Sequence, residues 1–175
     1  GPCGPDSEIY WDWGPEHGCG EPDCAPACPR CDRFLEFWHL VFMEYEQHPD
    51  GTLTPLPKQN IDTGMGLERI TAVLQGKLSN YDTDLFTPLL EAIGQRAGRQ
   101  HGGTMNPADV SMRVVADHLR AMTFLIADGV VPSNEWRGYV LRKIMRRAMR
   151  HGKKLGFTHP ILYELADVVV QEMRD

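Results

Sequence analysis

The most informative stretch of the chain reads Asn60-Ile61-Asp62-Thr63-Gly64-Met65-Gly66-Leu67-Glu68-Arg69-Ile70. It predicts a strand or loop end with one acid, then a Gly-x-Gly turn, then a helix with an arginine in its first turns. Two glycines one residue apart let the backbone approach a ligand closely, because neither has a Cβ atom. The helix start offers N–H groups to a phosphate, and Arg69 could add a bidentate contact. A tight strand-to-helix turn with a surface arginine would produce the same spacing, so both interpretations stay open.

The composition is that of an ordinary globular protein. The 175 residues are 42% hydrophobic and 24% charged, and they suffice for one or two small domains. No apolar run approaches the roughly 18 residues of a membrane span and no signal peptide opens the chain, so we expect a cytoplasmic protein without a membrane partner. The net charge of -6 is not that of a dedicated nucleic-acid binder. Gly1 falls inside a motif, and we expect a piece of a longer protein.

Residues 1–33 are rich in Gly, Pro, Asp and Cys, which predicts a loop with little regular structure. Four cysteines in this segment could bind a structural Zn²⁺ ion, because thiols this close in a cytosolic protein bind metal more often than they form disulfides. Free thiols are the alternative. His17 is a candidate substitute ligand, and Cys3 is expected only to pack. The four cysteines are Cys19, Cys24, Cys28 and Cys31.

Residues 34–46 are dense in aromatic and β-branched side chains and predict a buried strand. Asp50-Gly51 is a turn signal, so 52–61 should return as an antiparallel partner that ends at the glycine motif. Glu36 in this strand would be costly unless it meets a metal or a cation. Alternation along a strand equally allows Glu36 to point away from the sheet.

Helical spacing follows in several segments. We predict helices over 67–74 (ended by Gly76), over 82–98, from Asp109 or Ser111 as cap to about Ala127, and over 160–173. The Gly-rich segment 99–109 divides two predicted domains, 1–98 and 99–175.

A further helix, which begins near Trp136 with Ser133 or Asn134 as cap, carries an unmixed basic face. It supplies eight of the 18 Lys and Arg residues, with no acid between Trp136 and Tyr163. The basic residues are Arg137, Arg142, Lys143, Arg146, Arg147, Arg150, Lys153 and Lys154, and the predicted core stripe is Leu141, Ile144, Met145, Ala148 and Met149. This pattern favours a phosphate backbone, such as RNA, over a merely solvated face.

The motif Asp62-Thr63-Gly64-Met65-Gly66-Leu67-Glu68-Arg69 resembles motif 3 of class II aminoacyl-tRNA synthetases, in the form found in alanyl-tRNA synthetases. The likeness continues over nearly the whole chain, in Gly1-Pro2-Cys3-Gly4-Pro5, Pro55-Leu56-Pro57-Lys58, Ser79-Asn80-Tyr81-Asp82, Arg113-Val114-Val115-Ala116-Asp117-His118-Leu119-Arg120 and Pro132-Ser133-Asn134-Glu135. The resemblance implies an α+β chain: the C-terminal part of a class II antiparallel β-sheet domain with motif 3, followed by the start of an all-helical tRNA-recognition domain.

The resemblance also implies the reaction, which is ATP-dependent activation of L-alanine, with Mg²⁺, and transfer of the alanyl group to tRNA(Ala). Asp62 would hold the alanine ammonium, Gly64 and Gly66 would admit only a small side chain, and Arg69 would bind the ATP γ-phosphate. Glu8 and Glu36 are candidates for Mg²⁺ or ATP contact. Trp38, His39 and Val41 would line the alanine pocket.

In the helical part, Asn134 would read the acceptor-stem G·U pair from the minor groove, which is the readable groove of RNA. Arg137, Arg142, Arg146 and Arg150 would hold backbone phosphates. Asn134 as a simple helix cap predicts the same sequence.

Two positions depart from the family pattern, which usually has Asn in place of His39 and Cys in place of Asp6. Motifs 1 and 2 are not in the chain, so we expect it to need the remainder of the parent synthetase and to be inactive alone. A non-catalytic module that binds the tRNA acceptor stem is the alternative function, and a zinc-stapled interaction domain is a third.

Overall fold

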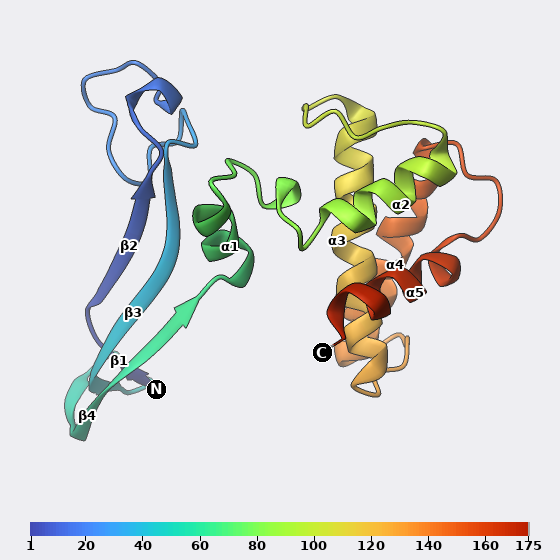
Figure 1. Cartoon of the computed structure of the whole chain (residues 1–175). Helices are drawn as coiled ribbons and strands as arrows, with labels where there is room; N and C mark the ends of the chain where they lie inside the picture. The colour runs from blue at the N-terminus through green and yellow to red at the C-terminus, as the bar shows by residue number, and fades with distance from the viewer. Residues whose placement is uncertain (175) are drawn as a thin grey trace. The chain divides into compact units, whose positions relative to one another are not determined.

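The computed structural model describes residues 1–174 and divides into two compact units, Gly1–Asn80 and Tyr81–Asp175 (Figure 1). The first unit is an antiparallel sheet with one α-helix and the second is all helical, which confirms the predicted α+β class. Sequence analysis predicts the boundary between the two domains after residue 98. The structure places helix α2 (Thr87–Ala97) in the second unit, because Leu89 and Ile93 of this helix are buried in its core.

Strand β3 (Phe34–Gln47) is the centre of the sheet. On one edge it pairs antiparallel with β1 (Pro2–Cys3) and β2 (Asp6–Asp12), and on the other with β4 (Leu53–Met65). The predicted strand pair is thereby confirmed. The prediction of little regular structure in 1–33 is wrong for β1 and β2, since their backbone groups bond to β3. Among the described residues of this unit, Ala72 is the one buried hydrophobic side chain.

The predicted Gly-x-Gly turn is also wrong. β4 continues through Gly64 to Met65, and helix α1 (Leu67–Gln75) follows Gly66, whose φ of -73° is ordinary extended backbone. What the two glycines provide is therefore the absence of a Cβ atom rather than an unusual φ. The helix ends as predicted at Gly76, which adopts the left-handed conformation with φ 62°.

The second unit packs α2, α4 (Trp136–Lys154) and α5 (Leu162–Met173) against α3 (Pro107–Ala127). Short 3₁₀ turns lie at Pro15–His17 and Asn80–Asp82. The predicted helix over 82–98 begins only at Thr87, after the second of these turns. The buried core includes Leu89, Ile93, Met112, Val115, Leu119, Leu141, Ala148 and Leu165.

Both predicted helix caps are wrong. Asn106 caps α3, because its Oδ1 accepts the N–H groups of Ala108 at 2.9 Å and Asp109 at 2.8 Å. No side chain caps α4, since Ser133 bonds to Glu135 instead. Within residues 1–174, no helix combines the length and apolar character that a membrane crossing requires.

Candidate functional site

An irregularity in β3 determines which side chains share a face of the sheet. The pairing of β2 with β3 skips Phe37, and the extra residue places Glu36 on the same face as His39. Glu8 of β2 lies directly opposite His39, and Val41 lies next along β3 on this face. Of the alternatives for Glu36, the structure therefore supports contact with a cation, because Arg69 lies beside it.

His39 lies among carboxylates. Its Nε2 atom is 3.1 Å from Asp6 Oδ2, and its Nδ1 atom is 3.9 Å from Glu36 Oε1. Nε2 is buried without an aligned hydrogen bond, so its contact with Asp6 is close in distance but lacks hydrogen-bond geometry. The Tyr10 hydroxyl donates to Glu8 Oε2 at 2.5 Å, which raises the pKa of Tyr10 to about 12. Sequence analysis missed Tyr10, because its two-residue spacing from Glu8 is informative only once residues 6–12 are known to form a strand.

Arg69, in the first turn of α1, is tied to β3. Its Nη1 atom donates to the Glu36 carbonyl oxygen at 2.7 Å and lies 3.7 Å from Glu36 Oε2. Gly66 donates its N–H to the Phe37 carbonyl at 3.0 Å, which anchors the start of the helix at the bulge. A Cβ atom at Gly66 would lie 3.3 Å from Arg69 Cδ, so glycine leaves room for the arginine.

Asp62 and Gly64 of β4 complete the face on the other side of β3. They pair with Val41 and His39 respectively, and both are exposed. A Cβ atom at Gly64 would have no neighbour within 4 Å, so the space above it is open. Trp38 lies on the opposite face, where its Nε1 donates to Thr63 Oγ1 at 2.6 Å. This face offers carboxylates to an ammonium or metal ion and a guanidinium to a phosphate. The residues that form it are Asp6, Glu8, Glu36, His39, Val41, Asp62, Gly64 and Arg69.

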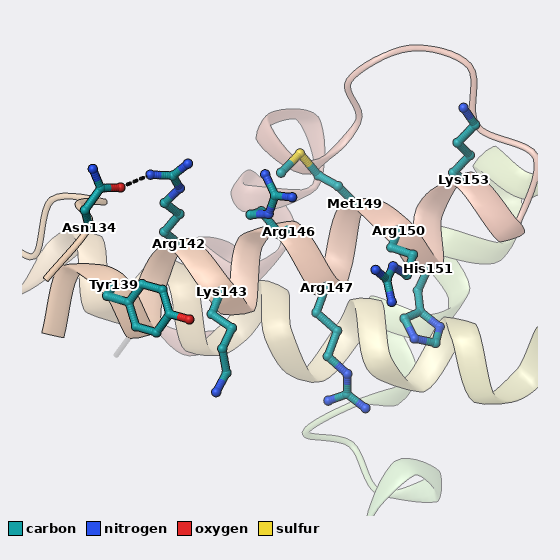
Figure 2. A pocket seen from close by; sticks show the side chains of 10 residues that line it. All are labelled: Asn134, Tyr139, Arg142, Lys143, Arg146, Arg147, Met149, Arg150, His151 and Lys153. Atoms are coloured by element: carbon teal, nitrogen blue, oxygen red, sulfur yellow. Dashed lines mark hydrogen bonds between the residues drawn. The ribbon is translucent and has the colours of Figure 1, made fainter. Parts of the chain in front are cut away.

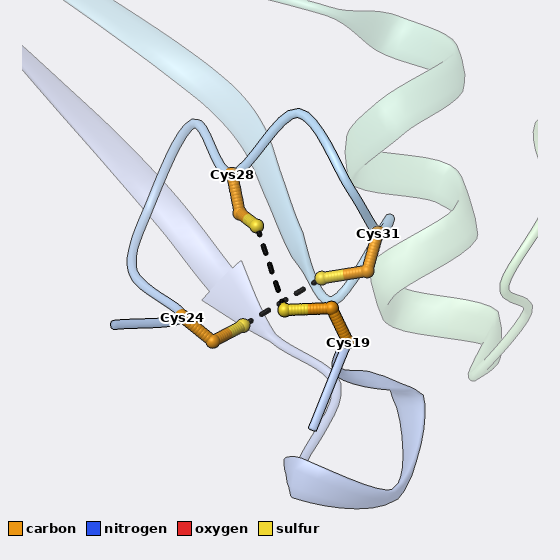
Figure 3. A group of neighbouring side chains, drawn as sticks. All are labelled: Cys19, Cys24, Cys28 and Cys31. Atoms are coloured by element: carbon orange, nitrogen blue, oxygen red, sulfur yellow. Dashed lines mark hydrogen bonds between the residues drawn. The ribbon is translucent and has the colours of Figure 1, made fainter. Parts of the chain in front are cut away.

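The four clustered cysteines converge, as Figure 3 shows. Their sulfur atoms all lie within 4.8 Å of one another, with Cys19 and Cys28 3.8 Å apart and Cys24 and Cys31 3.6 Å apart. Tetrahedral zinc with Zn–S distances of about 2.3 Å separates sulfurs by about 3.8 Å, so the four thiols fit this ion. His17 and Cys3 are not in the cluster.

Backbone groups favour the thiolate form at two of these cysteines. The Glu21 N–H group lowers the pKa of Cys19 to about 7, and the Arg33 N–H group lowers that of Cys31. Arg33 also closes the loop against β2 with two bonds to Asp12, at 2.6 and 2.7 Å. These bonds hold the pKa of Asp12 at about 2.

The basic helix α4 lines an open groove of about 840 Å³ (Figure 2). Three predicted phosphate contacts and Asn134 lie there, whereas Arg137 is exposed outside it. Met149 is 52% exposed and lines the groove, so its predicted place in the core stripe is wrong. The lining residues are Asn134, Tyr139, Arg142, Lys143, Arg146, Arg147, Met149, Arg150, His151 and Lys153.

Sequence analysis missed Tyr139 and His151 as groove residues, although Tyr139, Arg142 and Arg146 follow helical spacing. Arg147 donates to His118 Nε2 at 3.0 Å and is thus bound to α3. Burial and the nearby cations Lys154 and Arg147 lower the pKa of His151, so this imidazole is neutral near pH 7. The positive charge of the groove therefore comes from its lysines and arginines.

Comparison with known proteins gives a consistent result. The family described as tRNA synthetases class II (A) matches residues 1–175. A protein of Desulfosudis oleivorans named alanine–tRNA ligase is 55% identical over 175 residues, which is 100% of this chain and 20% of the relative. Proteins with the same name from Anaeromyxobacter sp. and Cereibacter sphaeroides are 55% and 57% identical, over 99% of this chain and 20% and 19% of their own lengths.

Proposed function

The chain belongs to the class II (A) family of tRNA synthetases, and we propose that it is part of an alanine–tRNA ligase. The observation that carries the proposal is the 55% identity with such a ligase over the whole of this chain. The chain spans about 20% of the length of the curated relatives it matches, so the complete reaction is proposed for the larger protein.

In the proposed reaction, the alanine carboxylate attacks the α-phosphorus of ATP and pyrophosphate leaves. The 3′-terminal hydroxyl of the tRNA then attacks the alanyl carbonyl, and AMP leaves. The sheet face supports roles for five residues. Asp62 binds the alanine ammonium, the open space above Gly64 accommodates a methyl side chain, and Arg69 contacts the γ-phosphate. Glu36 orients Arg69 through its carbonyl oxygen, and Glu36 and Glu8 would contact Mg²⁺–ATP.

The test is alanine-dependent exchange of pyrophosphate into ATP by the whole ligase. Asp62→Asn should raise the KM for alanine at least about tenfold, because the ammonium loses its charged partner. Asp50→Asn, in the turn between β3 and β4, is the matched control and should leave exchange unchanged. Equal exchange by the wild type and Asp62→Asn would overturn the role of Asp62, and exchange that does not depend on alanine would overturn the ligase proposal.

For the helical unit, we propose that the α4 groove binds the acceptor stem of tRNA(Ala). Asn134 contacts the minor groove at the G·U pair, and Arg146 and Arg150 contact phosphates. What supports this is that Asn134, in the loop before α4, and Arg146 and Arg150 of α4 line the same groove with further lysines and arginines. Arg137, outside the groove, would extend the phosphate contacts along the stem.

We also propose that Cys19, Cys24, Cys28 and Cys31 hold one Zn²⁺ ion. Four protein ligands fill a tetrahedral zinc and leave no position for substrate, so its role is structural. It would hold residues 13–33, which are poor in hydrophobic contacts, in a fixed conformation at the end of the sheet.

A further inference from the structure

The side-chain amide of Asn134 is held by an arginine. Arg142 Nη1 donates a hydrogen bond to Asn134 Oδ1, and the two side chains point toward each other in Figure 2. A guanidinium has donors and no acceptor, so only the oxygen of the amide can face it. The Asn134 NH₂ group is consequently turned away from Arg142, and among the described residues it has no protein acceptor.

The backbone that carries Asn134 is fixed as well. The Ser133 N–H donates to the Gly138 carbonyl at 3.1 Å, and Ser133 Oγ donates to the Glu135 carbonyl at 2.9 Å. A Cβ atom at Gly138 would lie 2.3 Å from Ser133 Oγ and 2.5 Å from the Val131 carbonyl oxygen, so the loop packs here only over a glycine. The loop holds Asn134 within reach of Arg142, one helical turn beyond Gly138.

Two other groove arginines, Arg146 and Arg150, differ from Arg142 in that no described group of the protein holds them. In the described part of the chain, Arg146 and Arg150 have no hydrogen bond or ion pair with protein groups, and both are exposed. An unpartnered guanidinium suits phosphate binding, whereas a guanidinium that is already bonded to an amide suits the orientation of that amide. Arg146, one turn beyond Arg142, is therefore a matched control.

We infer that Arg142 is a positioning residue that fixes Asn134 as a hydrogen-bond donor to the RNA minor groove. The NH₂ group so presented recognises an acceptor, such as a pyrimidine O2 atom or a ribose 2′-hydroxyl. The inference rests on the proposed function of the groove. It gives Arg142 a role in specificity in place of the phosphate contact expected from the sequence.

The first test uses the chain without RNA. In ¹H–¹⁵N spectra, Arg142→Leu should move the two side-chain NH₂ resonances of Asn134 toward those of a free amide, whereas Arg146→Leu should leave them in place. Unchanged Asn134 resonances in Arg142→Leu would overturn the inference. Because both arginines are exposed, the dispersion of the remaining resonances reports whether each variant is folded.

The second test measures binding of acceptor-stem hairpins that carry G·U or G·C at the recognised pair. The dissociation constant for the G·C hairpin divided by that for the G·U hairpin measures the preference for G·U. This ratio should fall about fivefold or more in Asn134→Ala and in Arg142→Leu. Adding Arg142→Leu to Asn134→Ala should not lower the ratio further. Arg146→Leu should weaken both hairpins equally. If Arg142→Leu also weakened binding of both hairpins by the same factor, Arg142 would make only a phosphate contact, and the inference would be overturned.

A wild-type chain that bound both hairpins equally would overturn the inference together with the role of Asn134. The ligase proposal would not fall with them, because the Asp62→Asn exchange assay tests it independently.

Discussion

His39 Nε2 lies 3.1 Å from Asp6 Oδ2, so the two positions that are expected from the sequence to depart from the alanyl-tRNA synthetase pattern lie against each other. Asp6 and His39 come from neighbouring strands, and an acid opposite an imidazole is complementary in charge when the ring is protonated. We interpret the two expected departures as one joint change on this face of the sheet. Both side chains are about half exposed, at 55% and 42%, which limits the strength of the interaction.

This interpretation predicts coupling between the two positions in alanine-dependent exchange by the whole ligase. Asp6→Cys and His39→Asn should each raise the KM for alanine. In the double variant, the rise in KM should be about two- to fivefold smaller than the product of the two single rises. The Asp50→Asn turn variant, combined with His39→Asn, is the control pair. Simple multiplication of the single effects would mean that the two departures are independent.

Gly138→Ala should disturb the loop that carries Asn134. The new Cβ atom would overlap Ser133 Oγ and the Val131 carbonyl, so we expect a loss of about 1–3 kcal/mol in the free energy of unfolding of the helical unit. Gly152→Ala is the matched control on the same helix, because its Cβ atom would meet only Phe157 Cδ2 at 3.6 Å. We expect Gly152→Ala to be neutral or stabilising in urea unfolding. Equal stability of the two variants would contradict the packing described at Gly138.

The stability of the helical unit should depend on Asp109 at acid pH. Burial raises the pKa of this carboxyl, but bonds from the Thr104 N–H and hydroxyl and the Gly102 N–H outweigh it and bring the pKa to about 2. A carboxyl with an unfolded-state pKa of about 3.9 then contributes stability that is complete above about pH 5 and is lost as pH falls toward 2.

Asp109→Asn should therefore lower the urea midpoint near neutral pH and flatten its fall between about pH 5 and 2. Asp128→Asn, at the exposed end of α3, is the control and should keep the wild-type pH profile. A wild-type profile in Asp109→Asn would show that the Gly102–Thr104 bonds do not stabilise the fold.

The cysteine cluster should bind one Zn²⁺ per chain, measured by metal analysis after dialysis. Cys24→Ser should lower zinc affinity sharply, because it removes a thiolate from a four-thiolate site. Cys3→Ser and His17→Ala should bind zinc as the wild type does, since neither residue is in the cluster. Removal of zinc should speed amide exchange in residues 13–33. Absence of stoichiometric zinc, or an equal loss in Cys3→Ser, would contradict the proposed site.

Sequence patterns predicted the elements whose contacts are local. Gly76 ends α1 because its left-handed φ needs only the preceding helix, and the spacing of Arg142, Arg146 and Arg150 alone predicts one basic face on α4. The sequence did not reveal β2, because its pairing partner β3 lies a whole loop away and its polar residues resemble a loop.

The organisation of the sheet face was also beyond sequence patterns. Strict alternation would separate Glu36 from His39, and only the bulge at Phe37 brings them together. One predicted α3 cap, Asp109, failed for a related reason: its carboxylate accepts N–H groups of Gly102 and Thr104 in the preceding loop, and Asn106 caps the helix instead. The roles of Asp62, Gly64 and Arg69 stay predictions that their placement on one face supports.

The most direct test of the account is binding of tRNA(Ala) acceptor-stem hairpins, G·U against G·C, to this chain over a series of salt concentrations. The account predicts preference for G·U at every salt concentration, with the affinity for both hairpins falling steeply as salt rises. Weak binding of both hairpins that does not respond to salt would contradict it, because the α4 groove would then not be an RNA-binding surface.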